Sequence, residues 1–125
     1  MIKASELRIG NWVYKDLSID DIELRQVLPG DIIYVAIEEE GGEDFMSYQP
    51  VALTEEWLHK FGFSTTQWDD FNSHRLMVGD NDYTIVIYSD GNCEVGDIVT
   101  LKIKSVHQLQ NLYFALSGKE LEIKK

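Results

Sequence analysis

Apolar positions follow a helical period most clearly near the C-terminus of the chain. Four apolar residues recur there at spacings typical of one helix face: Leu109, Leu112, Tyr113 and Leu116. Ser105 and Gln108 form a capping box at the start, and Gly118 favours the left-handed conformation that commonly ends a helix. We therefore predict a helix over residues 105–117 that packs its leucine face on neighbouring strands.

A second, shorter helix is predicted over residues 54–62. Thr54 is a good N-cap, and the two glutamates that follow it favour the positive end of the helix dipole. Trp57, Leu58 and Phe61 form its apolar face. Because so short a helix is not stable alone in water, packing must hold it.

Short apolar runs separated by turn residues favour strands in residues 1–50. The run at 32–37 is apolar on both faces and predicts a central strand, and Pro29 and Gly30 before it predict a turn. The remaining expectations are a turn into a strand at 7–14, a strand at 22–27, a solvated hairpin loop at 38–44 and an edge strand at 45–48 that ends by Pro50. Together they predict a small antiparallel sheet, for which an SH3-like arrangement is one option.

The second half of the chain predicts a β-meander within residues 74–103. Its strands are expected at 75–78, 83–88 and 98–103, with a short segment at 92–94 and turns rich in Asp, Asn and Gly between them. Residues 64–73 are polar and predict an irregular segment, and residues 120–124 predict a final strand. The expected fold is a single α+β domain over 1–125, with a β-rich region at 1–50, a helix at 54–62, the meander, and a helix at 105–117 packed on it.

Length and composition agree with one globular domain. The chain has 125 residues, of which 44% are hydrophobic and 26% are charged. One cysteine excludes an intramolecular disulfide, and the sequence holds neither a bilayer-spanning apolar run nor the apolar core of a signal peptide. We therefore expect a cytoplasmic protein that does not enter a membrane.

The net charge of −11 argues against nucleic-acid binding. Residues 1–56 carry 13 acids and 4 bases, whereas residues 57–125 carry 9 acids and 7 bases. Such a field repels phosphate backbones, because affinity for nucleic acids depends largely on Lys and Arg. Contact with a basic protein surface remains open.

The residues that most often carry catalysis or bind metals form no recognisable motif here. His59, His74 and His107 lack the spacing of a metal site, and we expect each on an exposed face or at the end of an element. Cys93 lies in a predicted hairpin, without the helix N-terminus that would lower the pKa of its thiol. The sequence therefore predicts no catalytic residue, no metal and no cofactor.

Several aromatic side chains stand where a core residue is not expected. Phe114 falls beside His107 and Asn111 on the helix face opposite the leucines, and Trp68 and Phe71 lie in a polar segment. Such aromatics either pack under another element of the chain or form a partner surface. The possible interaction surface therefore comprises His107, Asn111, Phe114, Trp68 and Phe71.

Three segments together resemble a family of small uncharacterised proteins of gut bacteria, often associated with prophages and mobile elements. The segments are Leu7–Val13 (LRIGNWV), Leu53–Phe63 (LTEEWLHKFGF) and Val106–Leu121 (VHQLQNLYFALSGKEL), and the resemblance spans nearly the whole chain. It implies no catalytic residue or cofactor. It does favour an accessory or host-interaction role.

The preferred prediction is a non-enzymatic protein-interaction or accessory protein of phage or mobile-element origin, which binds a protein partner or forms a homodimer. One alternative is an acidic mimic of nucleic acid, which needs the carboxylates of residues 16–21, 38–44 and 55–56 on one rigid face. The other is a small enzyme, which needs His74 or His107 beside a carboxylate or Cys93.

Overall fold

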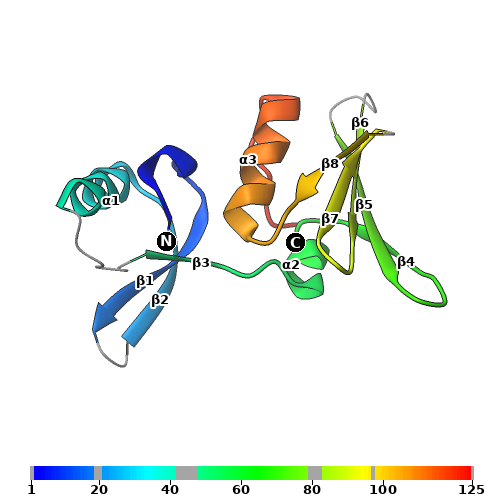
Figure 1. The fold of residues 1–125 in the computed structure, drawn as a ribbon, viewed down its shortest axis with the longest axis horizontal. Helices are drawn as coiled ribbons and strands as arrows, with labels where there is room; N and C mark the ends of the chain where they lie inside the picture. The colour runs from blue at the N-terminus through cyan, green and yellow to red at the C-terminus, as the bar shows by residue number, and fades with distance from the viewer. Residues whose placement is uncertain (1, 19–20, 42–47, 79–82, 97, 125) are drawn as a thin grey trace. The chain divides into compact units, whose positions relative to one another are not determined.

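The structure is a computed structural model that describes residues 2–18, 21–41, 48–78, 83–96 and 98–124. These residues form two antiparallel sheets and three α-helices, which confirms the α+β class (Figure 1). The chain divides into two compact units. The first unit comprises Met1–Ala52 and Ser105–Asn111, and the second comprises Leu53–Lys104 and Leu112–Lys125. That they form one domain stays a prediction.

The sheet of the first unit has the strand order β2-β1-β3, formed by β2 (Asp21–Gln26), β1 (Trp12–Ser18) and β3 (Tyr48–Pro50). The strands expected near 7–14 and 22–27 are thereby confirmed, and they pair antiparallel. Of the edge strand expected at 45–48, residues 45–47 lie outside the described residues. An SH3-like arrangement stays a prediction. One hydrophobic cluster in the core of this unit comprises Ile2, Leu7, Val13, Val27, Val35 and Tyr48.

The central strand predicted at 32–37 is wrong, because these residues lie in helix α1 (Pro29–Gly41). Pro29 occupies the first helical turn, where its missing N–H costs nothing. The Asp31 carboxylate accepts a hydrogen bond from the backbone N–H of Leu28 at 2.9 Å, which satisfies a donor at the helix start. Asp31 and Val35 point inward, four residues apart, as one helix face requires.

The same correction applies to the residues on either side of that run. The turn expected at Pro29 and Gly30 is instead the beginning of α1. The hairpin loop expected at 38–44 is helical up to Gly41, and residues 42–44 lie outside the described residues. An apolar run of this length does not by itself distinguish a strand from a helix.

A network of buried amides joins two segments of the first unit that are about 100 residues apart. The side-chain carbonyl of Gln110 accepts a hydrogen bond from the backbone N–H of Trp12 at 2.8 Å. Its side-chain NH₂ group donates to the backbone carbonyl of Gly10 at 3.1 Å. Asn11 donates to the side-chain oxygen of Asn111 at 3.0 Å. Asn111 in turn donates to the carbonyl of Glu6. Gly10 has a φ of +95°, a conformation that favours glycine.

The second unit contains a five-stranded sheet with the strand order β4-β5-β6-β7-β8. The predicted meander is confirmed, with strands β5 (Asn72–Val78), β6 (Tyr83–Tyr88), β7 (Asn92–Val95) and β8 (Ile98–Lys102). The irregular segment expected at 64–73 is confirmed only for residues 68–71, because Ser64–Gln67 form β4 and pair with β5. Two adjacent threonines, Thr65 and Thr66, suit a strand and could have indicated it.

The short predicted helix is confirmed as α2 (Glu55–Lys60). The Thr54 hydroxyl accepts a hydrogen bond from the backbone N–H of Trp57, as the cap predicts. Trp57, Leu58 and Phe61 are buried, so the packing expected to hold this helix is present. The final strand expected at 120–124 is wrong. These residues have no strand geometry, and Lys124 instead donates its backbone N–H to the carbonyl of Lys60 at 2.6 Å.

The C-terminal helix is confirmed as α3 (Val106–Ser117). The Gln108 side chain accepts from the backbone N–H of Ser105 at 3.2 Å, which is one half of the predicted capping box. Gly118 follows the helix with a φ of +73°. Leu109 is fully buried, and Leu112 and Leu116 are half-buried.

Candidate functional site

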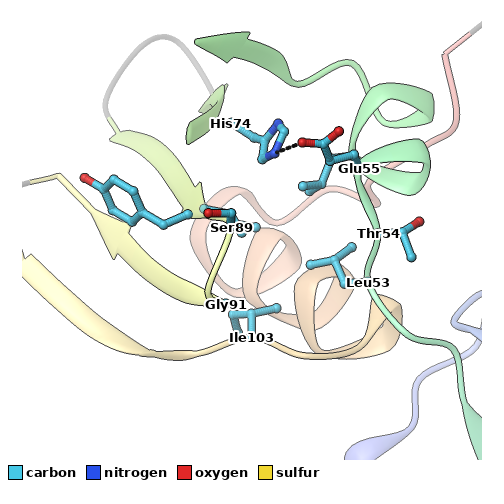
Figure 2. Close-up of a pocket in the computed structure, with 10 residues that line it drawn as sticks. Leu53, Thr54, Glu55, His74, Ser89, Gly91 and Ile103 are labelled. Atoms are coloured by element: carbon cyan, nitrogen blue, oxygen red, sulfur yellow. Dashed lines mark ion pairs between the residues drawn. The ribbon is translucent and has the colours of Figure 1, made fainter. Parts of the chain in front are cut away.

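A cavity of about 210 Å³ lies in the second unit, between the segment that leads into α2 and the turn that joins β6 to β7. We call it the histidine cavity. Its polar wall includes Glu55, His74 and Ser89, and its apolar wall includes Leu53 and Ile103. Figure 2 shows the carboxylate of Glu55 directed at the imidazole of His74. The enzyme alternative required such a histidine beside a carboxylate.

Hydrogen bonds extend this pair into a chain of four side chains. His74 Nε2 lies 3.5 Å from Glu55 Oε1, and His74 Nδ1 lies 2.9 Å from the hydroxyl of Thr65. The same hydroxyl lies 2.8 Å from Nε2 of His59. These distances suit a neutral His74 that carries its proton on Nε2 and accepts from Thr65 at Nδ1. The arrangement holds the imidazole between a carboxylate and a hydroxyl.

His74 lies within β5 and is buried, so the expectation that it lies on an exposed face or at the end of an element is wrong. Its side chain is only 1% exposed on β5. Burial lowers its pKa below the usual value, and the charge of His59 lowers it further, whereas the Glu55 carboxylate acts in the opposite direction. His74 is therefore a neutral side chain near pH 7.

His107 is also buried, at 3% exposure, and the prediction that it lies on an outward face of the helix is wrong. Its Nδ1 lies 3.2 Å from the hydroxyl of Ser105 in the first unit. Burial lowers the pKa of His107, and the carboxylate of Glu6 only partly opposes this.

We predict that acid destabilises the protein through these two histidines. Their folded pKa values lie below the unfolded value of about 6.5, so the unfolded chain binds more protons below that pH. The stability they contribute is fully present above pH 6.5 and is lost as the pH falls towards the folded pKa values. The slope is at most about 1.4 kcal/mol per pH unit for each histidine.

Urea unfolding between pH 7.5 and pH 5 measures this slope in the wild type and in the variant His74→Gln/His107→Gln. The variant should show a flatter dependence on pH. An equal slope in both proteins would assign the acid sensitivity to other groups.

A second hollow, of about 420 Å³, is lined by Asp70, Phe71, Tyr88, Ser89, Asp90 and Asn92. We call it the aromatic hollow. It shares Tyr88 and Ser89 with the histidine cavity, so both sites adjoin the end of β6. Neither a lysine nor an arginine is among its lining residues, whereas two are aspartates.

Two aromatic rings line this hollow, those of Phe71 and Tyr88, and a third ring stacks on Phe71. Trp68 stacks on Phe71 with the ring centroids 6.0 Å apart and the planes inclined by 23°. Phe71 meets Tyr88 edge to face, with centroids 5.8 Å apart. Trp68 and Phe71 nevertheless remain 52% and 42% exposed.

Local hydrogen bonds hold these rings in place. The backbone N–H of Trp68 donates to the carbonyl of Phe71 at 2.8 Å, which closes the turn between β4 and β5. The indole N–H of Trp68 donates to the hydroxyl of Ser73 at 3.1 Å. Burial, and the hydrogen bond that its hydroxyl donates to the Glu94 carboxylate, raise the pKa of Tyr88, although the charge of Arg75 acts in the opposite direction. Its side chain is therefore a neutral phenol at physiological pH.

The structure places the five residues predicted as an interaction surface in different local surroundings. It brings Trp68 and Phe71 together in an exposed stack. His107 is buried and Asn111 takes part in the amide network. The prediction that both side chains face outward is therefore wrong. Phe114 is 39% exposed on α3.

Sequence reasoning did not identify Tyr88, Glu55 or Thr65 as residues of a site. Tyr88 was assigned to a strand, and only its pairing with Ser73 places it beside Phe71. Glu55 was interpreted as a residue of the helix N-terminus, which it also is. The spacing of Glu55, Thr65 and His74 matches no local motif, so no sequence signal for this chain of contacts was available.

Among the residues that the structure describes, no group of three or more His, Cys, Asp or Glu side chains is arranged to hold a metal ion. In the same part of the chain, no helix is long and apolar enough to cross a bilayer.

Cys93 is buried in β7. The acids at positions 20, 43 and 44 lie outside the described residues, so mimicry of nucleic acid stays a prediction.

Comparison of the chain with models of protein families, with curated proteins and with solved structures finds no significant match.

Proposed function

We propose that the protein is a non-enzymatic, cytoplasmic accessory protein of phage or mobile-element origin that binds a protein partner. The origin rests on the resemblance of its three segments to prophage-associated proteins. The binding function rests on one structural observation, the exposed stack of Trp68 and Phe71 beside Tyr88.

The stack has the properties of a binding hot spot. Large aromatic side chains with limited internal freedom are enriched at such positions, because they bury much area and lose little entropy. Here the rings are held by one another and by the hydrogen bond from Trp68 to Ser73. A partner would therefore meet a surface that is already ordered, which lowers the entropic cost of binding.

The charge of the chain favours a partner other than a second copy. At a net charge of −11, two copies repel each other, whereas a basic surface is attracted. We therefore expect a monomer by light scattering at low salt, and binding to a basic protein.

We predict that the variant Trp68→Ala/Phe71→Ala loses the partner. The tagged full-length chain and this variant are used to capture proteins from a lysate of the bacterial host, and the captured protein is then titrated in pure form. Loss of two central aromatics should weaken binding by at least about thirtyfold, the effect of a hot spot of about 2 kcal/mol.

Phe114→Ala is the matched control, because it removes an exposed aromatic from α3. It should leave binding unchanged. A partner that is lost with Phe114→Ala, but retained by the double variant, would move the interface to α3 and contradict the proposal.

A second candidate function, a small hydrolase, is favoured by the contacts of His74. The order of carboxylate, imidazole and hydroxyl in Glu55, His74 and Thr65 is the order that activates a hydroxyl nucleophile in hydrolases. The wild type should then hydrolyse p-nitrophenyl acetate, and Thr65→Val should lower the rate by about a hundredfold or more while the fold is kept. Equal rates in the two proteins would rule out Thr65 as the nucleophile.

A further inference from the structure

The lining of the aromatic hollow combines aromatic ring faces with carboxylates. Phe71 and Tyr88 supply rings inclined by 61° to each other, and Trp68 covers Phe71 from a nearly parallel plane. Asp70 and Asp90 line the same hollow. Ring faces carry negative potential, so both kinds of wall attract a cation.

The carboxylate of Asp90 is held in a fixed orientation. Its two oxygens accept from the backbone N–H of Asn92 at 3.0 Å and from the Asn92 amide at 2.8 Å. Each oxygen retains acceptor capacity for a further donor. The Asp90 carboxylate is therefore already oriented to accept from a charged donor, and binding does not have to order it first.

The chemistry of the hollow disfavours anionic ligands and favours one kind of cation over another. Phosphates and nucleic acids are repelled by the lining carboxylates and by the net charge of −11. A guanidinium group can stack its plane on an aromatic face and direct its N–H groups at a carboxylate at the same time. A lysine ammonium is a compact, strongly hydrated charge that uses the ring face less well.

We infer that the aromatic hollow binds an arginine side chain presented by a basic segment of the partner protein. This inference rests on the proposed function and specifies what the partner must carry. The guanidinium would lie against Phe71 and Tyr88 and donate to Asp70 or Asp90. Trp68 would support Phe71 from its other side.

The test is an NMR titration of the ¹⁵N-labelled full chain with three blocked tripeptides, Gly-Arg-Gly, Gly-Lys-Gly and Gly-citrulline-Gly. Citrulline keeps the shape of arginine without its charge. We expect the arginine peptide to shift the indole N–H of Trp68 and the amides of Asp70, Phe71 and Asp90, and to bind more weakly as salt is added. The lysine peptide should bind more weakly, and the citrulline peptide should not bind.

Two variants locate the contact. Phe71→Leu keeps an apolar side chain but removes the ring face, and it should weaken binding of the arginine peptide about fivefold, the size of one exposed cation–π contact. Asp70→Asn should weaken it in the same direction, whereas Phe114→Ala should not. Thermal unfolding of each variant establishes that it is folded.

Three results would overturn the inference: no shift at these residues, equal binding of the citrulline peptide, or equal binding of the lysine peptide. Free L-arginine that binds more tightly than the peptide would also overturn it, because the ligand would then be a small molecule.

The capture experiment and the peptide titration together distinguish failure of this inference from failure of the proposed function. If the double variant Trp68→Ala/Phe71→Ala loses its partner but no arginine peptide binds, the arginine specificity is wrong and the interaction surface stands. If the arginine peptide binds but that variant keeps its partner, the hollow stands and its assignment to the partner is wrong.

Discussion

Phe61→Ala should lower the free energy of unfolding by about 3–5 kcal/mol, the usual cost of removing a buried phenylalanine ring. The Phe61 side chain is fully buried at the end of α2, and its ring lies 5.7 Å from that of Trp57. Because α2 is too short to be stable alone, loss of this ring removes much of the packing that holds it. Urea unfolding followed by far-UV circular dichroism measures the change.

Phe71→Ala is the matched control for this variant. It removes the same ring from a residue that is 42% exposed, so the cost should be about 1 kcal/mol or less. If both variants lose equal stability, the burial of Phe61 does not account for the effect. A folded Phe71→Ala protein would also establish that this position tolerates substitution in the binding experiments.

Gln110→Met should destabilise the protein by about 2 kcal/mol although the two side chains have similar volumes. The thioether cannot replace the carbonyl oxygen that accepts from the backbone N–H of Trp12 at 2.8 Å. Gln110 is 1% exposed, so water does not easily reach the group left without its partner. The cost comes from a buried donor that loses its hydrogen bond, and not from a cavity left by the substitution.

Gln26→Met provides a close control, because Gln26 donates to the same Gly10 carbonyl as Gln110, at 3.2 Å. The difference is that Gln26 is exposed, and the Gly10 carbonyl keeps the hydrogen bond from Gln110 after this substitution. We expect a change within about 0.5 kcal/mol for Gln26→Met. Equal losses in the two glutamine variants would mean that burial of the amide network contributes little.

The two helices that were predicted correctly have local signals at their ends. Thr54 caps α2, and Gln108 and Gly118 mark the start and end of α3. The meander was predicted because Asp, Asn and Gly in its turns limit the backbone to a few conformations. These signals act between residues close in the chain, so they can be read without knowledge of the fold.

Helix α1 shows the limit of that reasoning. The apolar run 32–37 fits a buried strand as well as a helix, and Pro29 and Gly30 fit a turn as well as the helix start that Asp31 caps. The outcome depends on packing, since Val35 joins a core built from β1, β3 and the N-terminal segment. Tertiary contacts routinely override such an ambiguous local preference.

Composition and neighbouring residues along the chain are enough to predict the α+β class, the two capped helices, the strands of the meander and the acidic net charge. The burial of His74 and His107 and the contact of Gln110 with Trp12 become known only from the folded structure. The same holds for the position of Tyr88 beside Phe71. The physical reason is that burial and side-chain contact depend on strand register and on segments far apart in the sequence, which no local pattern specifies.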